Sequence, residues 1–181
     1  MFALEMLAVV VTIFSAATIV WSTLRVGISP MPSSEKARDA IFELMKDSGG
    51  GTVYDLGSGW GSLVIPLARQ YPNRRIVGYE ISFVPWLVSV LRKRFFGLRN
   101  LHLYRKDFLQ ADFSKAEVLI CYLHTVGMSE IAKKLMAERC FDGILISNNF
   151  GLRDFQPERT VQINDFYKSP IYRYRLSWVG Q

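Results

Sequence analysis

The hydrophobic pattern along this chain alternates between short apolar runs and segments of helical spacing. Apolar runs at 53–56, 75–80, 101–105, 117–123 and 144–147 have the length of buried strands. Between them, apolar residues recur every three or four positions, as in amphipathic helices, over 33–48, 63–70, 82–96 and 129–137. This regular alternation predicts an α/β fold built on a largely parallel sheet.

Two segments add detail to this prediction. Residues 160–167 and 171–178 alternate polar and apolar positions, which indicates two antiparallel strands joined through 168–170 and a sheet of seven strands in all. In the helix after Ser82, the apolar spacing predicts a buried face made of Phe83, Trp86, Leu87, Val90 and Leu91.

The N-terminal pattern is different, because residues 2–24 are almost continuously apolar and carry one charge, Glu5. About 20 helical residues cross a bilayer, so this run predicts one transmembrane helix within an anchor at residues 1–26, followed by a folded domain at 27–181. A cleaved signal peptide is less favoured, since no basic residue precedes the run. Arg25, Lys36 and Arg38 follow it, which predicts a single-pass membrane protein with the domain at 27–181 in the cytoplasm. The alternative is a long helix packed on a partner protein.

Composition narrows the chemistry. The chain has 181 residues and a net charge of +6, enough for one domain with an appendage. Cys121 and Cys140 stand far apart and there are two histidines, so neither a metal site nor a disulfide framework is expected. One basic cluster is either a solvated face or a lipid-contacting surface, and nucleic acid is disfavoured as a partner; it comprises Arg92, Lys93, Arg94, Arg99, His102, Arg105 and Lys106.

The most informative stretch is the turn after the first predicted strand. Asp55 ends that strand, and Gly57, Gly59 and Gly61 follow at alternate positions. Glycine is required where the backbone takes positive φ or closely approaches a ligand, although a strand-to-helix turn alone can also need it. The pattern is not the dinucleotide fingerprint Gly-x-Gly-x-x-Gly, because residue 62 is Ser. Glu80 ends the second strand, where an acid can accept both hydroxyls of a ribose.

The stretch 55–61 resembles motif I of the class I S-adenosylmethionine-dependent methyltransferases. This resemblance implies S-adenosylmethionine as the cofactor and a Rossmann-like, seven-stranded methyltransferase sheet that ends in an antiparallel hairpin. Where that family often has an acid after the second glycine, this chain has Trp60. By resemblance, the cofactor site comprises Asp55 at the methionine end, Gly57, Ser58, Gly59 and Gly61 in the turn, Glu80 and Ile81 at the ribose, and Asp107 and Phe108 at the adenine. For Asp107 and Phe108, loop capping and core packing remain alternatives.

Further segments narrow the resemblance. Pro-x-Pro-Ser at 30–33, Asp-Leu-Gly-Ser-Gly at 55–59 and the segment 149–160 are similar to small membrane-anchored lysine methyltransferases that modify the c subunit of ATP synthase or an adenine nucleotide translocase. That similarity implies methylation of a lysine on a membrane-associated protein. After 117–123 the chain lacks the Asn/Asp-Pro-Pro-Tyr/Phe tetrapeptide of enzymes that methylate adenine or glutamine amides, which disfavours those acceptors.

Few residues are candidates for binding the group that accepts the methyl. Methyl transfer to lysine requires a neutral amine held in line with the S–CH₃ bond, with water excluded. Tyr122 and His124, at the end of the fourth strand, are the predicted catalytic residues, and Asn148 and Asn149 could supply amide acceptors. Tyr122 as a core residue and His124 as an ordinary loop residue remain open. A lipid or quinone methyltransferase and a non-catalytic cofactor-binding adaptor are the competing functions.

Overall fold

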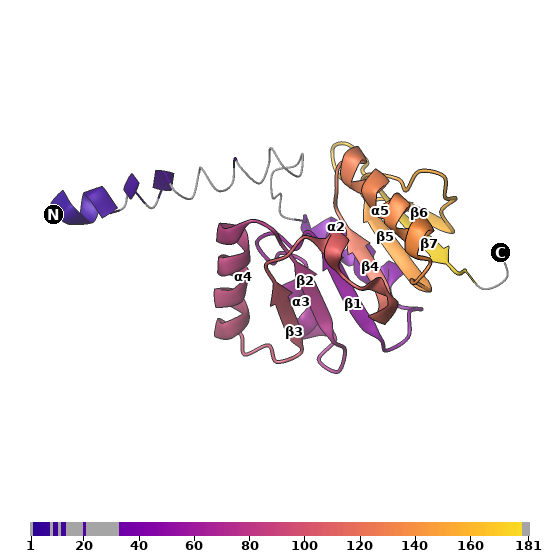
Figure 1. Cartoon of the computed structure of the whole chain (residues 1–181), viewed down its shortest axis with the longest axis horizontal. Helices are drawn as coiled ribbons and strands as arrows, with labels where there is room; N and C mark the ends of the chain where they lie inside the picture. The colour runs from indigo at the N-terminus through magenta and orange to yellow at the C-terminus, as the bar shows by residue number, and fades with distance from the viewer. Residues whose placement is uncertain (1, 8, 11, 14–19, 21–32, 179–181) are drawn as a thin grey trace.

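A seven-stranded mixed sheet forms the centre of the protein (Figure 1). The computed structural model describes residues 2–7, 9–10, 12–13, 20 and 33–178. Five strands are parallel and the last two add an antiparallel hairpin, in the order β3-β2-β1-β4-β5-β7-β6. Their bounds are β1 Thr52–Leu56, β2 Ile76–Tyr79, β3 Leu101–Tyr104, β4 Ala116–Cys121, β5 Gly143–Asn148, β6 Arg159–Gln162 and β7 Pro170–Leu176. The predicted Rossmann-like sheet with its C-terminal hairpin is therefore confirmed.

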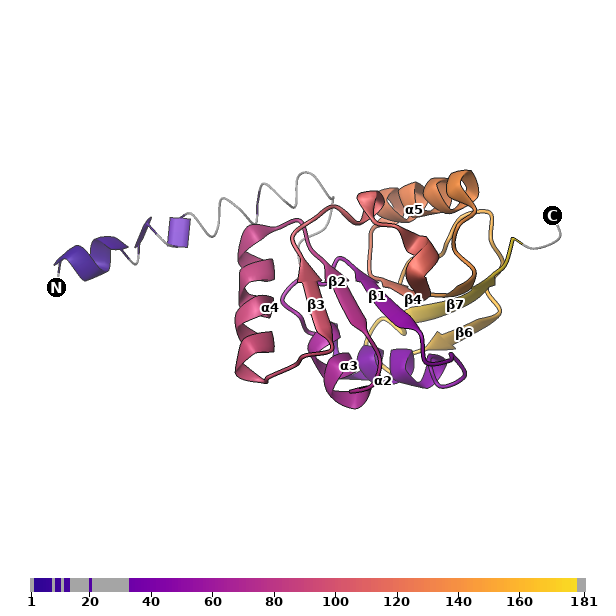
Figure 2. The same ribbon diagram turned by 60° about the horizontal axis from the view of Figure 1, so that its bottom comes forward.

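Helices cover both faces of the sheet (Figure 2). One core cluster joins α5 to the sheet through Met128, Ile131 and Leu135. The other joins α2 and α3 to the opposite face through Ile41, Leu44 and Leu67. The strands β1, β4 and β5 contribute apolar residues to both clusters, which explains their continuous apolar runs. The helices are α2 Glu35–Leu44, α3 Val64–Gln70, α4 Phe83–Phe95 and α5 Thr125–Glu138, with short 3₁₀ turns η1 Phe108–Gln110 and η2 Phe113–Lys115.

Two predicted element boundaries are wrong. The helix expected from residue 129 begins four residues earlier, at Thr125, because His124 takes an extended conformation and its carbonyl accepts the first helical hydrogen bond, from the Met128 amide. The strand expected at 160–167 ends at Gln162, because the side chain of Asp165 accepts hydrogen bonds from both the amide and the hydroxyl of Ser169 and closes a loop instead.

The predicted buried face of α4 is also wrong in part. Phe83, Trp86 and Val90 are half-buried, but Leu87 and Leu91 are exposed. The buried residues of this helix are Pro85 and Ser89, on nearly the opposite side. Tertiary hydrogen bonds, described below, turn the helix this way.

The predicted membrane-spanning helix of residues 2–24 lies largely outside the described residues. In the part of the chain that the structure describes, no helix is long and apolar enough to cross a membrane. The described apolar side chains near the N-terminus, such as Phe2 and Leu4, are exposed.

Candidate active site

A cavity of about 300 Å³ lies at the carboxyl ends of the parallel strands. Its walls come from the glycine turn after β1 and the start of α3, the end of β2, the segment 106–109 and the ends of β4 and β5. Ser33 before α2, Ile41 on α2 and the N-terminal part of α5 complete them. In open α/β sheets this edge is the position of ligand sites, because loops and helix N-termini converge there.

The glycine turn forms the floor of the cavity for a steric reason. Gly57, Gly59 and Gly61 have φ values of 101°, 51° and 77°, which side chains rarely adopt. A Cβ on Gly61 would lie 2.9 Å from Ile65 Cδ1 and 3.0 Å from Ser89 Oγ. The predicted requirement for glycine is met at all three positions, and the bare backbone of Gly57 and Gly59 lines the cavity.

Glu80 ties this turn to the next strand. Its carboxylate is 7% exposed, and Oε2 accepts a hydrogen bond from the Gly59 amide at 2.9 Å while Oε1 accepts one from the Ser82 amide at 2.7 Å. A carboxylate has about four acceptor positions, so two remain available on the cavity side. Glu80 can therefore hold the turn and bind two ribose hydroxyls at once.

Helix α4 holds the glycine turn from behind. The Ser89 hydroxyl is 2.8 Å from the Gly59 carbonyl, to which it donates, and Arg92 Nη1 donates to the Trp60 carbonyl at 2.7 Å. Both bonds require the Ser89 side of the helix to face inward, and this orientation leaves Leu87 at the surface. The hydrophobic pattern of the sequence did not predict that Ser89 and Arg92 face inward, because such a pattern depends only on the spacing of apolar residues.

Asp55 is a buried acid that faces the cavity. It is 5% exposed and lines the cavity, and no donor in the described part of the chain is hydrogen-bonded to its carboxylate. Burial, which is the larger cause, and the nearby charge of Glu80 together raise the pKa of Asp55 from 3.8 to about 7. Two buried acids without an internal cation between them favour a positively charged ligand at this place.

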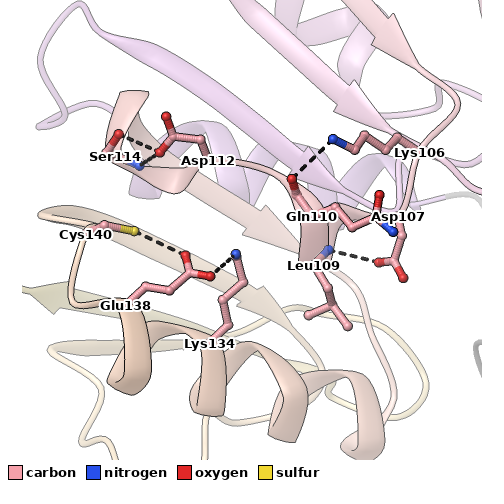
Figure 3. A network of polar contacts seen from close by, with 9 residues as sticks. All are labelled: Lys106, Asp107, Leu109, Gln110, Asp112, Ser114, Lys134, Glu138 and Cys140. Atoms are coloured by element: carbon pink, nitrogen blue, oxygen red, sulfur yellow. Dashed lines mark hydrogen bonds and ion pairs between the residues drawn. The ribbon is translucent and has the colours of Figure 1, made fainter.

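The far end of the cavity is lined by Ile81, Asp107 and Phe108, the predicted ribose and adenine contacts. Oδ1 of Asp107 accepts a hydrogen bond from the Leu109 amide at 2.9 Å and so caps η1 (Figure 3). Loop capping and a role at the adenine are compatible, because capping uses one carboxylate oxygen. The Lys106 ammonium points away from this carboxylate and donates to the Gln110 carbonyl at 3.3 Å (Figure 3).

The predicted catalytic residues are separated by the structure. Tyr122 is half-buried and lines the cavity, and Asn148 from the neighbouring strand does so too, with 6% of its surface exposed. His124 is exposed and is not among the cavity-lining residues; its ring lies 5.4 Å from that of Phe150 and its Nδ1 is 3.1 Å from Thr125 Oγ1. Asn149, with a φ of 72°, also stays outside the lining.

Sequence reasoning missed the contribution of α5. Because this helix begins at Thr125, it brings Val126, Gly127 and Glu130 to the cavity wall. A Cβ on Gly127 would lie 3.1 Å from Leu123 Cβ, so glycine lets the first turn pack closely on the end of β4. No Ser, Thr, Asp or Asn stands at the N-cap to mark this start in the sequence.

The network at the other end of α5 is structural. Lys134 lies 2.5 Å from Glu138 Oε1, and the Cys140 thiol lies 3.5 Å from Glu138 Oε2 (Figure 3). Asp112 accepts hydrogen bonds from the amide and hydroxyl of Ser114 and caps η2. None of these residues lines the cavity.

S-adenosylmethionine fits this arrangement from end to end. Asp55 and the glycine turn suit a cationic methionine portion, the free acceptor positions of Glu80 suit a ribose, and Asp107 between apolar side chains suits an adenine. The fold and the site define a class I S-adenosylmethionine-dependent methyltransferase.

Comparison with known proteins specifies the family. Residues 55–159, more than half of the chain, match the ANTKMT methyltransferase domain, and the protein belongs to this family. It is similar to a protein-lysine N-methyltransferase of Saccharolobus islandicus (strain REY15A), with 26% identity over 139 residues that cover 75% of this chain and 84% of the relative.

Two further similarities are with RNA methyltransferases. A solved RNA methyltransferase from Salinibacter ruber, in complex with S-adenosyl-L-homocysteine, has a TM-score of 0.72 and 26% identity, covering 82% of this chain and 95% of that one. A probable ribosomal RNA small subunit methyltransferase A from Methanosarcina mazei is 32% identical over 107 residues, which are 59% of this chain and 38% of that protein. The complex agrees with the cofactor assigned from the site.

Proposed function

We propose that this enzyme transfers a methyl group from S-adenosylmethionine to the side-chain amine of a lysine in a membrane-associated protein. The observation that carries the proposal is that Tyr122, directly after β4, and Asn148, at the end of the adjacent strand β5, both line the cavity. Among the described residues, neither the Tyr122 hydroxyl nor the Asn148 amide has a hydrogen-bond partner. Both groups are therefore free to bind a substrate.

The proposed subsites follow the strand order. If Asp107 and Phe108 hold the adenine after β3 and Glu80 holds the ribose after β2, a methionine portion at Asp55 on β1 would direct its methyl group toward β4, where Tyr122 lies. When bound, S-adenosylmethionine supplies a methyl group on a positively charged sulfur. Tyr122 and Asn148 accept the N–H groups of the incoming amine, so that its lone pair points at that methyl group.

The amine must arrive without its extra proton. Glu130 lines the cavity and is 41% exposed, so its carboxylate attracts a lysine ammonium to the entrance, where it also pairs with Lys133 at 2.8 Å. Deeper in, burial between apolar side chains such as Ile120 and Leu123 disfavours the charged form and lowers the pKa of the lysine. We propose no step for His124, which was predicted as catalytic but is exposed and does not line the cavity.

Two observations support a protein-lysine acceptor. The relative from Saccharolobus islandicus is a protein-lysine N-methyltransferase and is matched over most of its length. The segment after β4 reads Tyr122-Leu123-His124-Thr125 in place of the tetrapeptide of adenine and glutamine methyltransferases. The apolar run 2–24 supports a membrane location, with a single-pass anchor and a cytoplasmic catalytic domain as the proposed arrangement.

The test is transfer of labelled methyl groups by the full chain. Membranes from cells that lack the protein are incubated with labelled S-adenosylmethionine and the wild-type protein or Glu80→Ala, and label is counted separately in proteins, extracted lipids and RNA. Mass spectrometry then locates the modified residue. Label on a lysine of a membrane protein, absent with Glu80→Ala, is the expected result.

RNA methylation is the second candidate, because of the similarity to the Salinibacter ruber enzyme. Label recovered in RNA, together with an affinity of the protein for RNA that falls steeply with salt, would favour an RNA methyltransferase over a lysine methyltransferase. Label confined to lipids would indicate a lipid or quinone acceptor. Cofactor binding without transfer to any of the three pools would indicate an adaptor.

The proposed membrane anchor is tested separately, by whether the full chain stays in the membrane fraction during alkaline extraction.

A further inference from the structure

The outer face of α4 carries apolar side chains that no part of the described chain covers. Leu87, Leu91 and Phe95 are spaced four residues apart and are 36%, 58% and 85% exposed. They form one stripe, opposite the Ser89 and Arg92 side that holds the glycine turn. Figures 1 and 2 show α4 at the outer edge of the domain, beside the edge strand β3.

The sequence around this stripe is strongly basic. Residues 56–106, which include α3 and α4, hold nine of the 22 lysines and arginines of the chain but one of its 16 acids. That acid is Glu80, which is buried in the cavity; of the nine bases, Arg74 is equally buried and pairs with Glu117 at 3.6 Å, which leaves eight bases that are exposed or half-buried. Arg94 and Arg99 lie next to the stripe in sequence and are exposed. The rest of the chain has slightly more acids than bases, so the positive charge is concentrated at this edge.

We propose that α4 docks on an anionic membrane surface, with Leu87, Leu91 and Phe95 among the lipids and the basic residues at the headgroups. A helix with one apolar side flanked by Lys and Arg binds in the plane of the membrane interface, through buried apolar area and attraction to anionic lipid. Neither RNA nor an acidic protein loop would bury the two leucines of this apolar stripe as effectively. The lipid surface satisfies both the stripe and the charge.

The length of the N-terminal chain agrees with such docking. Eight residues, 25–32, separate position 24, the end of the apolar run, from Ser33, where the described domain begins. An extended chain spans at most about 3.5 Å per residue, so a domain anchored by residues 2–24 stays within about 30 Å of the bilayer. The docking surface does not depend on which group is methylated, and its test involves no methyl transfer.

The experiment measures lipid contact of α4 in the full chain. In a Cys140→Ser background, which leaves the buried Cys121 as the remaining native thiol, Leu91→Cys is labelled with a polarity-sensitive fluorophore. The matched control carries the same label at Met136→Cys, an exposed position 41% accessible on α5. Both proteins are mixed with vesicles of phosphatidylcholine alone or with 30% phosphatidylglycerol, with and without brominated chains.

The label at Leu91 is expected to shift to the blue and to be quenched by brominated lipid in the anionic vesicles, while the label at Met136 does neither. Arg94→Gln and Arg99→Gln are each expected to weaken this response about fivefold. No response at Leu91, or an equal response at Met136, would overturn the proposal. So would a blue-shifted Leu91 label before vesicles are added, which would mean that residues 2–24 or a second copy cover the stripe. A response to added RNA in place of vesicles would also overturn it.

Discussion

Asp55 and Glu80 are both buried at the ends of the neighbouring strands β1 and β2, and the pKa of Asp55 is raised first by its burial and then by the charge of Glu80. Glu80 is stabilised by two backbone amides, but Asp55 is hydrogen-bonded to no donor in the described chain. The cofactor site therefore contains an acid whose charge is costly until a cationic ligand arrives.

This relationship predicts an unusual pH dependence of stability. The cofactor-free protein keeps a proton on Asp55 up to about pH 7, whereas the unfolded chain releases it near pH 4. Between these values the folded state binds more protons, so the free energy of unfolding falls as pH rises. Asp55→Asn is expected to remove this slope and to be more stable than wild type at pH 8 by on the order of a few kcal/mol, measured by urea unfolding.

The same substitution is expected to impair cofactor binding. Asp55→Asn loses the charge that we propose faces the methionine portion, so its affinity for S-adenosylmethionine should fall about tenfold or more. Wild-type affinity should increase between pH 6 and pH 8, since binding requires the ionised acid, and the variant should show no such trend in calorimetry. A variant that is less stable at pH 8 yet binds normally would disprove the cost assigned to Asp55.

Glu80→Gln tests the link between the glycine turn and the ribose. In the wild type, each carboxylate oxygen of Glu80 accepts a hydrogen bond from a backbone N–H, of Gly59 or of Ser82. Glutamine has one oxygen and one NH₂ group, so its NH₂ group would face one of these N–H donors. The dissociation constant for S-adenosylmethionine should rise more than tenfold by equilibrium dialysis. The matched control is Glu138→Gln on α5, which removes a surface contact with Lys134 and should leave binding unchanged.

Gly61→Ala tests the steric requirement of the turn. The substitution combines a φ of 77° with a Cβ placed 2.9 Å from Ile65 Cδ1, and it should destabilise the protein by about 1–3 kcal/mol in thermal or urea unfolding. Gly50→Ala is the control, because a Cβ there meets nothing within 4 Å. That variant should stay within about 0.5 kcal/mol of wild type. Equal effects of the two substitutions would contradict the steric argument.

Ser89→Ala tests the support of the turn by α4. Loss of the hydroxyl leaves the Gly59 carbonyl without its donor at 2.8 Å, so the turn should loosen and the KM for S-adenosylmethionine should rise several-fold. Ser129 makes a comparable bond to the carbonyl four residues before it, but on the exposed side of α5. Ser129→Ala should therefore leave the KM unchanged, and a rise in both variants would point to a general loss of stability.

The acceptor side is tested by Tyr122→Phe and Asn148→Ala. Each removes one proposed contact with the amine, and kcat should fall about tenfold or more while the affinity for S-adenosylmethionine stays the same. Label incorporation into the membrane protein fraction gives the rate, and equilibrium dialysis gives the affinity. Tyr167→Phe, at an 84% exposed loop position, is the matched control. Unchanged kcat in both active-site variants would place the amine elsewhere.

One side of the cavity wall could be predicted because its residues stand at the ends of neighbouring strands. Asp55 lies at the end of β1, the three glycines follow it and Glu80 follows β2, so their local order implies their meeting at one sheet edge. The acceptor side is different. Asn148 approaches Tyr122 only through the pairing of β5 with β4, and Glu130 reaches the cavity only because α5 starts at Thr125. His124 was predicted to be catalytic because it follows Tyr122 closely in sequence, but it does not line the cavity.

The sequence by itself determined the alternating strands and helices, the glycine turn and the positive charge of residues 56–106, because each depends on residues close together in the chain. Only the tertiary structure decided which side of α4 is buried. Apolar spacing favoured the side of Leu87 and Leu91, but the carbonyls of Gly59 and Trp60 need donors, and Ser89 and Arg92 provide them. Hydrogen bonds between segments 30 or more residues apart cannot be read from local periodicity.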